Sequence, residues 1–369
     1  KTGAYFFLLS KMTGASARFY VVCFILHNFV FDAMGVPFIV TAAGMILLIW
    51  LYTRKGGIKT LVWTDAFQTL CMFAAVVLII YNVMVSLGMD ASETVKAIAS
   101  DSHSRMFVFD DIMSRQYFWK QFISGIFIVI VMTGLDQDMM QKNLTCKSLA
   151  DAKKDMCTYG FAFVPANLLF LSLGLLLVIL SGRMGIELPA KGDDLLPLFA
   201  ASGTFGNSVL MLFTIGIVAA SFSSADSALT SMTTCFCVDI CRRKDDEALR
   251  KRTHIVMGVV FLLFVLLFRA VNSQSVIDAI YTLCGYTYGP LLGLFAFAII
   301  GKLKANDKAV PFIAIASPIV CFIADWLTSH YTSYRFGYEL LMLNGLLTFI
   351  GLWISSIKSD KQENAKQLS

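Results

Sequence analysis

The sequence predicts an all-α protein that crosses a membrane many times, and three observations carry this prediction. Of its 369 residues, 57% are apolar and 15% are charged, whereas a soluble domain carries about 25% charged residues. The mean hydropathy is +0.71. Apolar residues gather into segments close to the roughly 17–25 residues that a helix needs to cross a bilayer. This composition excludes a soluble enzyme, a nucleic-acid-binding module and a secreted disulfide scaffold.

Ten such segments follow one another along the chain. The predicted crossings span residues 17–31, 37–53, 60–84, 118–134, 157–181, 208–240, 254–268, 276–300, 310–327 and 338–357. Polar or glycine-rich stretches separate them, the longest at 88–116 and 182–207. We therefore predict a single transmembrane domain over residues 1–357 and a polar cytoplasmic tail, 358–369, that is frayed. Because the chain begins at Lys1 instead of Met, we also expect it to be incomplete at its N-terminus.

The lysines and arginines predict the orientation, because positively charged loops stay in the cytoplasm. With ten crossings, 21 of the 30 Lys and Arg residues fall on one side and eight on the other, with Lys1 left out. The larger group includes Lys11 and Arg18, assigned to the N-terminal side of the first crossing, and the basic run at 242–252. We therefore expect a multi-pass protein of the inner or plasma membrane with its C-terminus in the cytoplasm.

The sixth crossing carries polar groups that lipid does not tolerate well, since a carboxylate at the bilayer centre costs about 2.5–3.5 kcal/mol. Residues 219–231 read AASFSSADSALTS. Helical spacing gives one stripe of small and hydroxyl side chains, with Asp226 at its edge: Ala220, Ser223, Ser224, Ser227 and Ser231. Hydroxyls, carbonyls and one carboxylate suit a hard cation such as Na⁺. The alternative is a small-residue packing face, for which Asp226 is unnecessary.

Two other crossings have polar ends. Asp65 and Gln68 share a face near the start of the third crossing, where the helix dipole alone would also favour an acid. Gly134 lies where the fourth crossing turns polar, which favours a broken helix beside a cavity over an ordinary membrane exit. In the eighth crossing, the segment 281–290 places tyrosines around a predicted Gly-Pro break, although an interfacial tyrosine belt explains them equally well.

Three separated segments carry patterns that occur together in one family. Residues 52–68, YTRKGGIKTLVWTDAFQ, resemble a hairpin of the form YT-x-x-GG followed by WTD-x-x-Q. Residues 134–142, GLDQDMMQK, resemble G-x-(N/D)-Q-x-x-x-Q-(R/K), and residues 219–231 resemble AA-x-x-S-(S/T)-x-x-S-x-L. These are motifs of the sodium:solute symporter family, which the chain resembles from about residue 1 to residue 357.

The resemblance implies a LeuT-like fold, a five-plus-five inverted repeat, in which these ten crossings would be the third to the twelfth and the first core helices would be lacking. It implies a main sodium site at Ala220, Ser223 and Ser224. It also implies a second ion site at Asp65, Asp226 and Ser227. Asp226 stands where family members with that site have serine, so a carboxylate pair there could bind Na⁺ more strongly or carry a proton.

The solute is expected in mid-membrane, between the broken fourth crossing and the third, sixth and eighth. The residues expected near it are Gln68, Asp136, Gln137 and Thr282. Two positions depart from the family's sugar transporters, because Asp138 replaces an aromatic gating residue and Thr282 replaces a sugar-binding glutamine. A sugar substrate is therefore not supported by residue match.

The sequence thus predicts a secondary active transporter that couples Na⁺ to a small organic solute: a sugar, sugar acid, amino acid or carboxylate. Its expected partners are that solute, Na⁺ and the lipid bilayer, with no cofactor other than the coupling ion, no nucleic acid and no enzymatic activity. One alternative is proton coupling. Another is an intramembrane aspartyl enzyme built on Asp65 and Asp226, but the sequence lacks the GxGD motif expected of such an enzyme.

Overall fold

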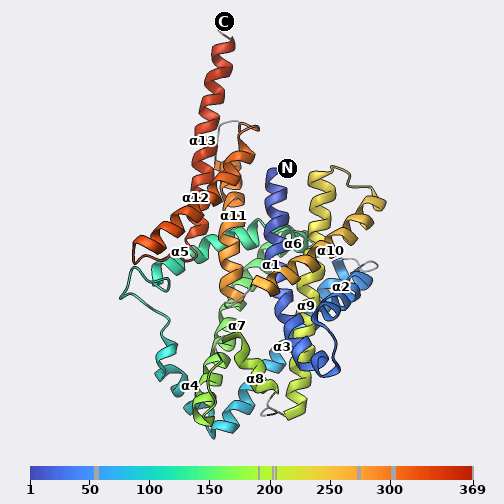
Figure 1. The fold of residues 1–369 in the computed structure, drawn as a ribbon, viewed down its shortest axis with the longest axis vertical. Helices are drawn as coiled ribbons and strands as arrows, with labels where there is room; N and C mark the ends of the chain where they lie inside the picture. Colours follow the sequence, from blue (N-terminus) through green and yellow to red (C-terminus); the bar gives the residue numbers. More distant parts are fainter. Residues whose placement is uncertain are drawn as a thin grey trace.

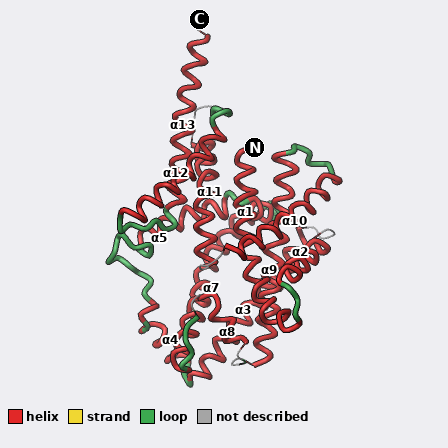
Figure 2. Tube along the Cα trace, in the orientation of Figure 1, coloured by secondary structure: helices red, strands yellow, loops and turns green. Residues whose placement is uncertain are grey.

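The computed structural model describes residues 1–53, 58–189, 192–201, 203, 206–271, 276–300 and 305–367. In this part of the chain, helices are joined by loops and there is no strand (Figure 2). The all-α prediction is therefore confirmed for the described residues. Gly56 and Gly57, predicted to form a tight hairpin, lie outside them.

The α-helices of the described residues are α1 (Thr2–Leu26), α2 (Phe38–Thr53), α3 (Ile58–Leu87), α4 (Ala91–Ser100), α5 (Phe118–Val129), α6 (Gln137–Asn143), α7 (Leu149–Met184), α8 (Leu195–Ala201), α9 (Gly206–Cys235), α10 (Glu247–Val271), α11 (Val276–Ile300), α12 (Val310–Tyr331) and α13 (Leu340–Gln367). Short π-helical turns extend three of them: η1 (His27–Phe31) after α1, η4 (Ile130–Gly134) after α5 and η6 (Phe236–Ile240) after α9. Each predicted crossing falls on one of the longer helices, in the predicted order.

Six helices in the described part are long and apolar enough to cross a membrane: α1, α3 from Asp65, α7, α10, α11 and α12. The bent pair formed by α5 and α6 adds a seventh if it is one span. The apolar segments Phe38–Leu51 of α2 and Leu340–Ser356 of α13 are shorter. A multi-pass membrane protein is therefore confirmed, whereas the count of ten crossings is not.

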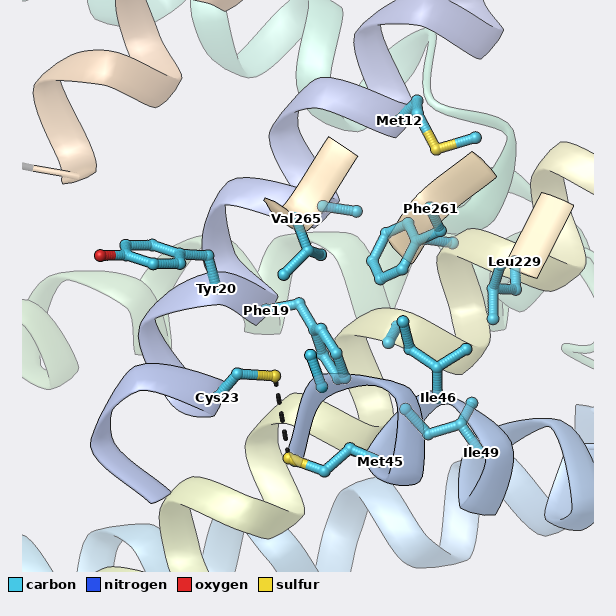
Figure 3. Packing of buried hydrophobic residues seen from close by; sticks show 14 of the residues in the cluster. Met12, Phe19, Tyr20, Cys23, Met45, Ile46, Ile49, Leu229, Phe261 and Val265 are labelled. Carbon is cyan, nitrogen blue, oxygen red and sulfur yellow. Dashed lines mark hydrogen bonds between the residues drawn. The ribbon is translucent and has the colours of Figure 1, made fainter. Parts of the chain in front are cut away.

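Helix α1 is at the centre of the molecule, where it packs against α2, α9, α10 and α11 (Figure 1). Of its apolar window, 56% is buried inside the protein, against 17% for α12, which leaves most of α12 facing outward. Figure 3 shows the main cluster of buried side chains, in which Phe19 and Phe261 pack with ring centroids 5.5 Å apart. In the same cluster, Cys23 Sγ lies 3.8 Å from Met45 Sδ. This packing fixes α1 relative to α9, which carries the serine-rich segment.

The first predicted crossing was placed too late in the chain. α1 begins at Thr2, so Lys11 and Arg18 lie inside it and are not loop residues that can set the orientation. Lysine at the edge of an apolar run resembles the end of a membrane crossing, whereas here it lies inside a helix that begins nine residues earlier. The cytoplasmic location of the C-terminus consequently remains a prediction. At the other end of the chain, α13 projects beyond the other helices and continues to Gln367, into the segment 358–369 that is predicted to be a frayed tail (Figure 1).

The predicted break around Pro290 was also wrong, because α11 runs through it. Proline has no N–H, so the carbonyl of Tyr286, four residues earlier, loses its helical partner. The side chain of Asn344 on α13 replaces that partner, since its Nδ2 donates to Tyr286 O and to Gly285 O at 3.0 Å each. Asn344 is fully buried, and the hydroxyl of Ser317 on α12 donates to its backbone carbonyl at 2.8 Å. A neighbouring helix thus keeps α11 continuous.

Candidate ion and solute site

The break predicted at Gly134 is confirmed. The π-turn η4 ends at Gly134, and the chain changes direction by 63° before continuing as α6. Asp136 is the N-cap of α6, and its Oδ1 accepts a hydrogen bond from Asp138 N at 2.9 Å. A carboxylate at a helix N-terminus satisfies backbone N–H groups that have no partner within the helix. The break therefore holds two aspartates at a fixed position in the interior.

Lys11 of α1 forms ion pairs with both of these aspartates. Its Nζ lies 3.0 and 2.9 Å from the two carboxylate oxygens of Asp136 and 3.2 Å from Asp138 Oδ2. Lys11 and Asp136 are only 6% and 5% exposed. The hydroxyl of Tyr288 on α11, which is also buried and therefore not part of an interfacial belt, donates to Asp136 Oδ2 at 3.4 Å. The predicted residue Asp136 is thus neutralised by a lysine that the sequence analysis had assigned to a loop.

A second ion pair continues from the same short helix. Lys142, in the last turn of α6, has its Nζ 3.1 Å from Asp65 Oδ2 on α3 and 3.8 Å from Asp138 Oδ1. Asp138 therefore lies between two lysines, with Lys11 near one carboxylate oxygen and Lys142 near the other. Asp65 is half-buried, and its partner is a lysine on a segment 77 positions away in the sequence.

The aspartate of the serine-rich segment lies in the same electrostatic neighbourhood. Asp226 is 2% exposed and interacts electrostatically with Asp65, Lys142 and Asp138. Among the described residues, three buried oxygens here lack a hydrogen-bond partner: Asp65 Oδ1, Asp226 Oδ1 and Ser227 Oγ. Leaving buried oxygens unpaired is unfavourable by about 1–3 kcal/mol each, and more for a charged one. Carboxylate and hydroxyl oxygens are the ligand types that a hard cation prefers, so the chemistry of these groups fits such an ion.

The other predicted site residues are less closely grouped. Ser223 and Ser224 are half-buried on α9, on the same helix as Ala220, and Gln68 and Gln137 are half-buried on α3 and α6. Thr282 on α11 borders a cavity of about 30 Å³ whose described lining residues include Arg115, Asp325 and Leu340 but no other predicted site residue. The geometry therefore groups the ion residues more clearly than the solute residues.

Two residues of this region escaped the sequence analysis. Lys11 was assigned to a loop, and Lys142 was counted only as a positive charge of a cytoplasmic segment. The signal available for Lys11 is its position in the middle of a 25-residue helix whose only other charged residue is Arg18. A buried ammonium group in such a helix needs a carboxylate partner, because an unpaired charge in the membrane is expensive.

The model of the family described as "Sodium:solute symporter family" matches residues 20–309 of this sequence. The chain belongs to the sodium:solute symporter family. This is a family of transporters, so the aspartyl enzyme considered from the sequence is excluded.

Two relatives of this symporter-family chain are named for sialic acid and for monocarboxylates. It is 25% identical over 320 residues to the sodium/sialic acid symporter SiaT of Proteus mirabilis, covering 82% of this chain and 63% of the relative. It is 28% identical over 296 residues to the sodium-coupled monocarboxylate transporter 2 of Bos taurus, covering 73% of this chain and 44% of the relative. The symporter chain thus spans less than two thirds of the length of these relatives.

A solved structure supports the fold of this symporter chain. It is that of a Na⁺-coupled sialic acid symporter in a substrate-bound, outward-open state, with a TM-score of 0.75 and 23% sequence identity. The match covers 96% of this chain and 73% of that chain. The described helices therefore follow the architecture of a sialic acid symporter over nearly their whole length.

Proposed function

We propose that this chain carries the ion-binding helices of a secondary active transporter that couples Na⁺ movement to uptake of a small organic solute. The observation that supports this proposal most directly is the set of three unpaired buried oxygens on Asp65, Asp226 and Ser227. Na⁺ prefers several oxygen ligands, and these lie where a cation would also reduce the excess of carboxylates over ammonium groups. One Na⁺ moving through 100 mV supplies about 2.3 kcal/mol, which supports a roughly 50-fold solute gradient.

The proposed roles follow the position of each residue. Ala220, Ser223 and Ser224 would hold the main sodium ion, and Asp65, Asp226 and Ser227 a second ion. The solute would lie near Gln68, Asp136, Gln137 and Thr282, in an inner or plasma membrane. Within the predicted solute classes, sugar acids and carboxylates are favoured by the sialic acid and monocarboxylate relatives.

Sodium is expected to stabilise the purified chain against thermal unfolding, whereas K⁺ and choline are not. A ligand at 100 times its dissociation constant adds about 2.7 kcal/mol to the free energy of unfolding. The double variant Ser223→Ala/Ser224→Ala removes two hydroxyl ligands and should lose most of this Na⁺-specific increment. Ser355→Ala is the matched control, because that hydroxyl bonds only a carbonyl of its own helix, Leu352 O at 3.0 Å.

A second candidate function is proton coupling, and the unpaired Oδ1 of buried Asp226 is the observation that favours it. In that case Na⁺ would leave the melting temperature of the wild type unchanged. Asp226→Asn would then abolish the dependence of solute uptake on the pH gradient while a residual, uncoupled uptake persisted. Na⁺-specific stabilisation of the wild type, lost in the double serine variant, would contradict proton coupling as the only coupling mode.

A further inference from the structure

Lys142 places a tethered cation beside the oxygens proposed for the second ion. Its Nζ lies 3.1 Å from Asp65 Oδ2, while Asp65 Oδ1, on the same carboxylate, has no partner among the described residues. Asp226 also interacts electrostatically with Lys142. An ion held by Asp65 and Asp226 would therefore sit close to an ammonium group and be repelled by it.

A second carboxylate is available to Lys142. Asp138 precedes it by one turn on α6, and its Oδ1 lies 3.8 Å from Lys142 Nζ. The other oxygen of Asp138 is occupied by Lys11 at 3.2 Å, so Oδ1 is the one that can receive Lys142. Lys142 keeps 31% of its side chain exposed, and lysine has a flexible four-carbon stem, so a change of partner requires only rotamer changes.

We propose that Lys142 is an internal competitor for the coupling ion: it pairs with Asp65 when the second ion site is empty and moves to Asp138 when a cation binds. This inference rests on the proposed sodium-coupled function. It assigns to Lys142 a regulatory role in the occupancy of the site, without making it an ion ligand.

The change of partner by Lys142 would also make the charge balance at the helix break depend on whether the second ion site is occupied. When Lys142 pairs with Asp138, the charge of that carboxylate is shared between two lysines, and the pull of Asp138 on Lys11 weakens. Lys11 is the partner of Asp136, the residue that caps α6 immediately after the break. One chain of charged groups therefore runs from the proposed ion site on α3 and α9 to the break beside which the solute is expected.

The test measures the Na⁺ concentration that gives half-maximal thermal stabilisation of the full chain in detergent, with choline replacing Na⁺ to keep ionic strength constant. Lys142→Gln removes the competitor and should lower this concentration by about tenfold. Lys142→Arg keeps the charge but can hold the Asp65 carboxylate bidentately, and should raise it by about threefold or more. Asp138→Asn removes the alternative partner and should also raise it.

Two comparisons make the result decisive. Lys147→Gln removes an exposed lysine five positions later and should leave the half-saturating concentration unchanged. If Lys142→Gln lowers the half-saturating Na⁺ concentration but Lys142→Arg leaves it unchanged, the positive charge alone explains the result. That outcome would overturn competition for a carboxylate. If Na⁺ stabilises the wild type but Lys142→Gln matches it, competition is wrong and the sodium site stands. If neither protein responds to Na⁺, the sodium-coupled function and the competition fail together.

Discussion

Replacing Lys11 with methionine is expected to lower the free energy of unfolding by about 3–5 kcal/mol, because it leaves buried carboxylates without their partner. Methionine fills a similar volume, so the loss reports mainly the missing charge. Asp136 is 5% exposed, and its carboxylate would keep two hydrogen-bond donors among the described residues, the hydroxyl of Tyr288 and the backbone N–H of Asp138. The measurement is chemical unfolding in mixed micelles, with the helix content followed by circular dichroism.

The double variant Lys11→Met/Asp136→Asn separates the ion pair from general damage to α1. Asparagine still caps a helix, so removing both charges together should recover much of the stability that the single variant loses. Lys96→Met provides the control, because Lys96 is exposed on α4 and its loss should change the free energy of unfolding by less than about 0.5 kcal/mol. Equal losses in the single and double variants would show that Lys11 contributes through packing and not through its charge.

Gly293→Ala is expected to destabilise the protein by about 1–3 kcal/mol, the range typical of an overpacked interior. A Cβ at this position would lie 2.5 Å from Gly345 O and 2.5 Å from Thr348 Cβ on α13. Because one of these atoms belongs to the backbone, the two helices must move apart to admit the methyl group. Thermal unfolding in detergent measures the effect.

A glycine-to-alanine substitution where the added methyl group has open space should not lower the free energy of unfolding. A Cβ at Gly174 on α7 meets nothing within 4 Å, and alanine favours a helix over glycine by up to about 1 kcal/mol. Gly174→Ala is therefore expected to leave the protein equally or slightly more stable. A loss of similar size at both positions would mean that the close approach of α11 and α13 is not what makes Gly293 necessary.

The local features of this chain could be predicted from its sequence. Apolar segments of sufficient length gave the order of the long helices. The change from apolar to polar residues at Gly134 predicted the break between α5 and α6. The serine-rich segment and Asp65 were predicted to share an ion site, and the structure brings Asp65 within electrostatic range of Asp226.

The incorrect predictions concern residues whose partners are far away in the sequence. Lys11 pairs with an aspartate 125 positions later, and without that partner its burial could not be anticipated. Pro290 does not break α11 because Asn344, on another helix, bonds the carbonyl that proline leaves free. The place of Thr282 in the solute site came from the family resemblance and stays a prediction.

The bond between Asn344 and the carbonyl of Tyr286 has a consequence for the biogenesis of the protein. A nascent chain enters the bilayer segment by segment, and α11 is synthesised before the segment that completes its backbone hydrogen bonding. In hydrocarbon, with no water to substitute, that carbonyl stays unpaired until α13 arrives. We therefore expect α11 to be retained near the insertion machinery until α13 has been made, so that these two segments leave it as a pair.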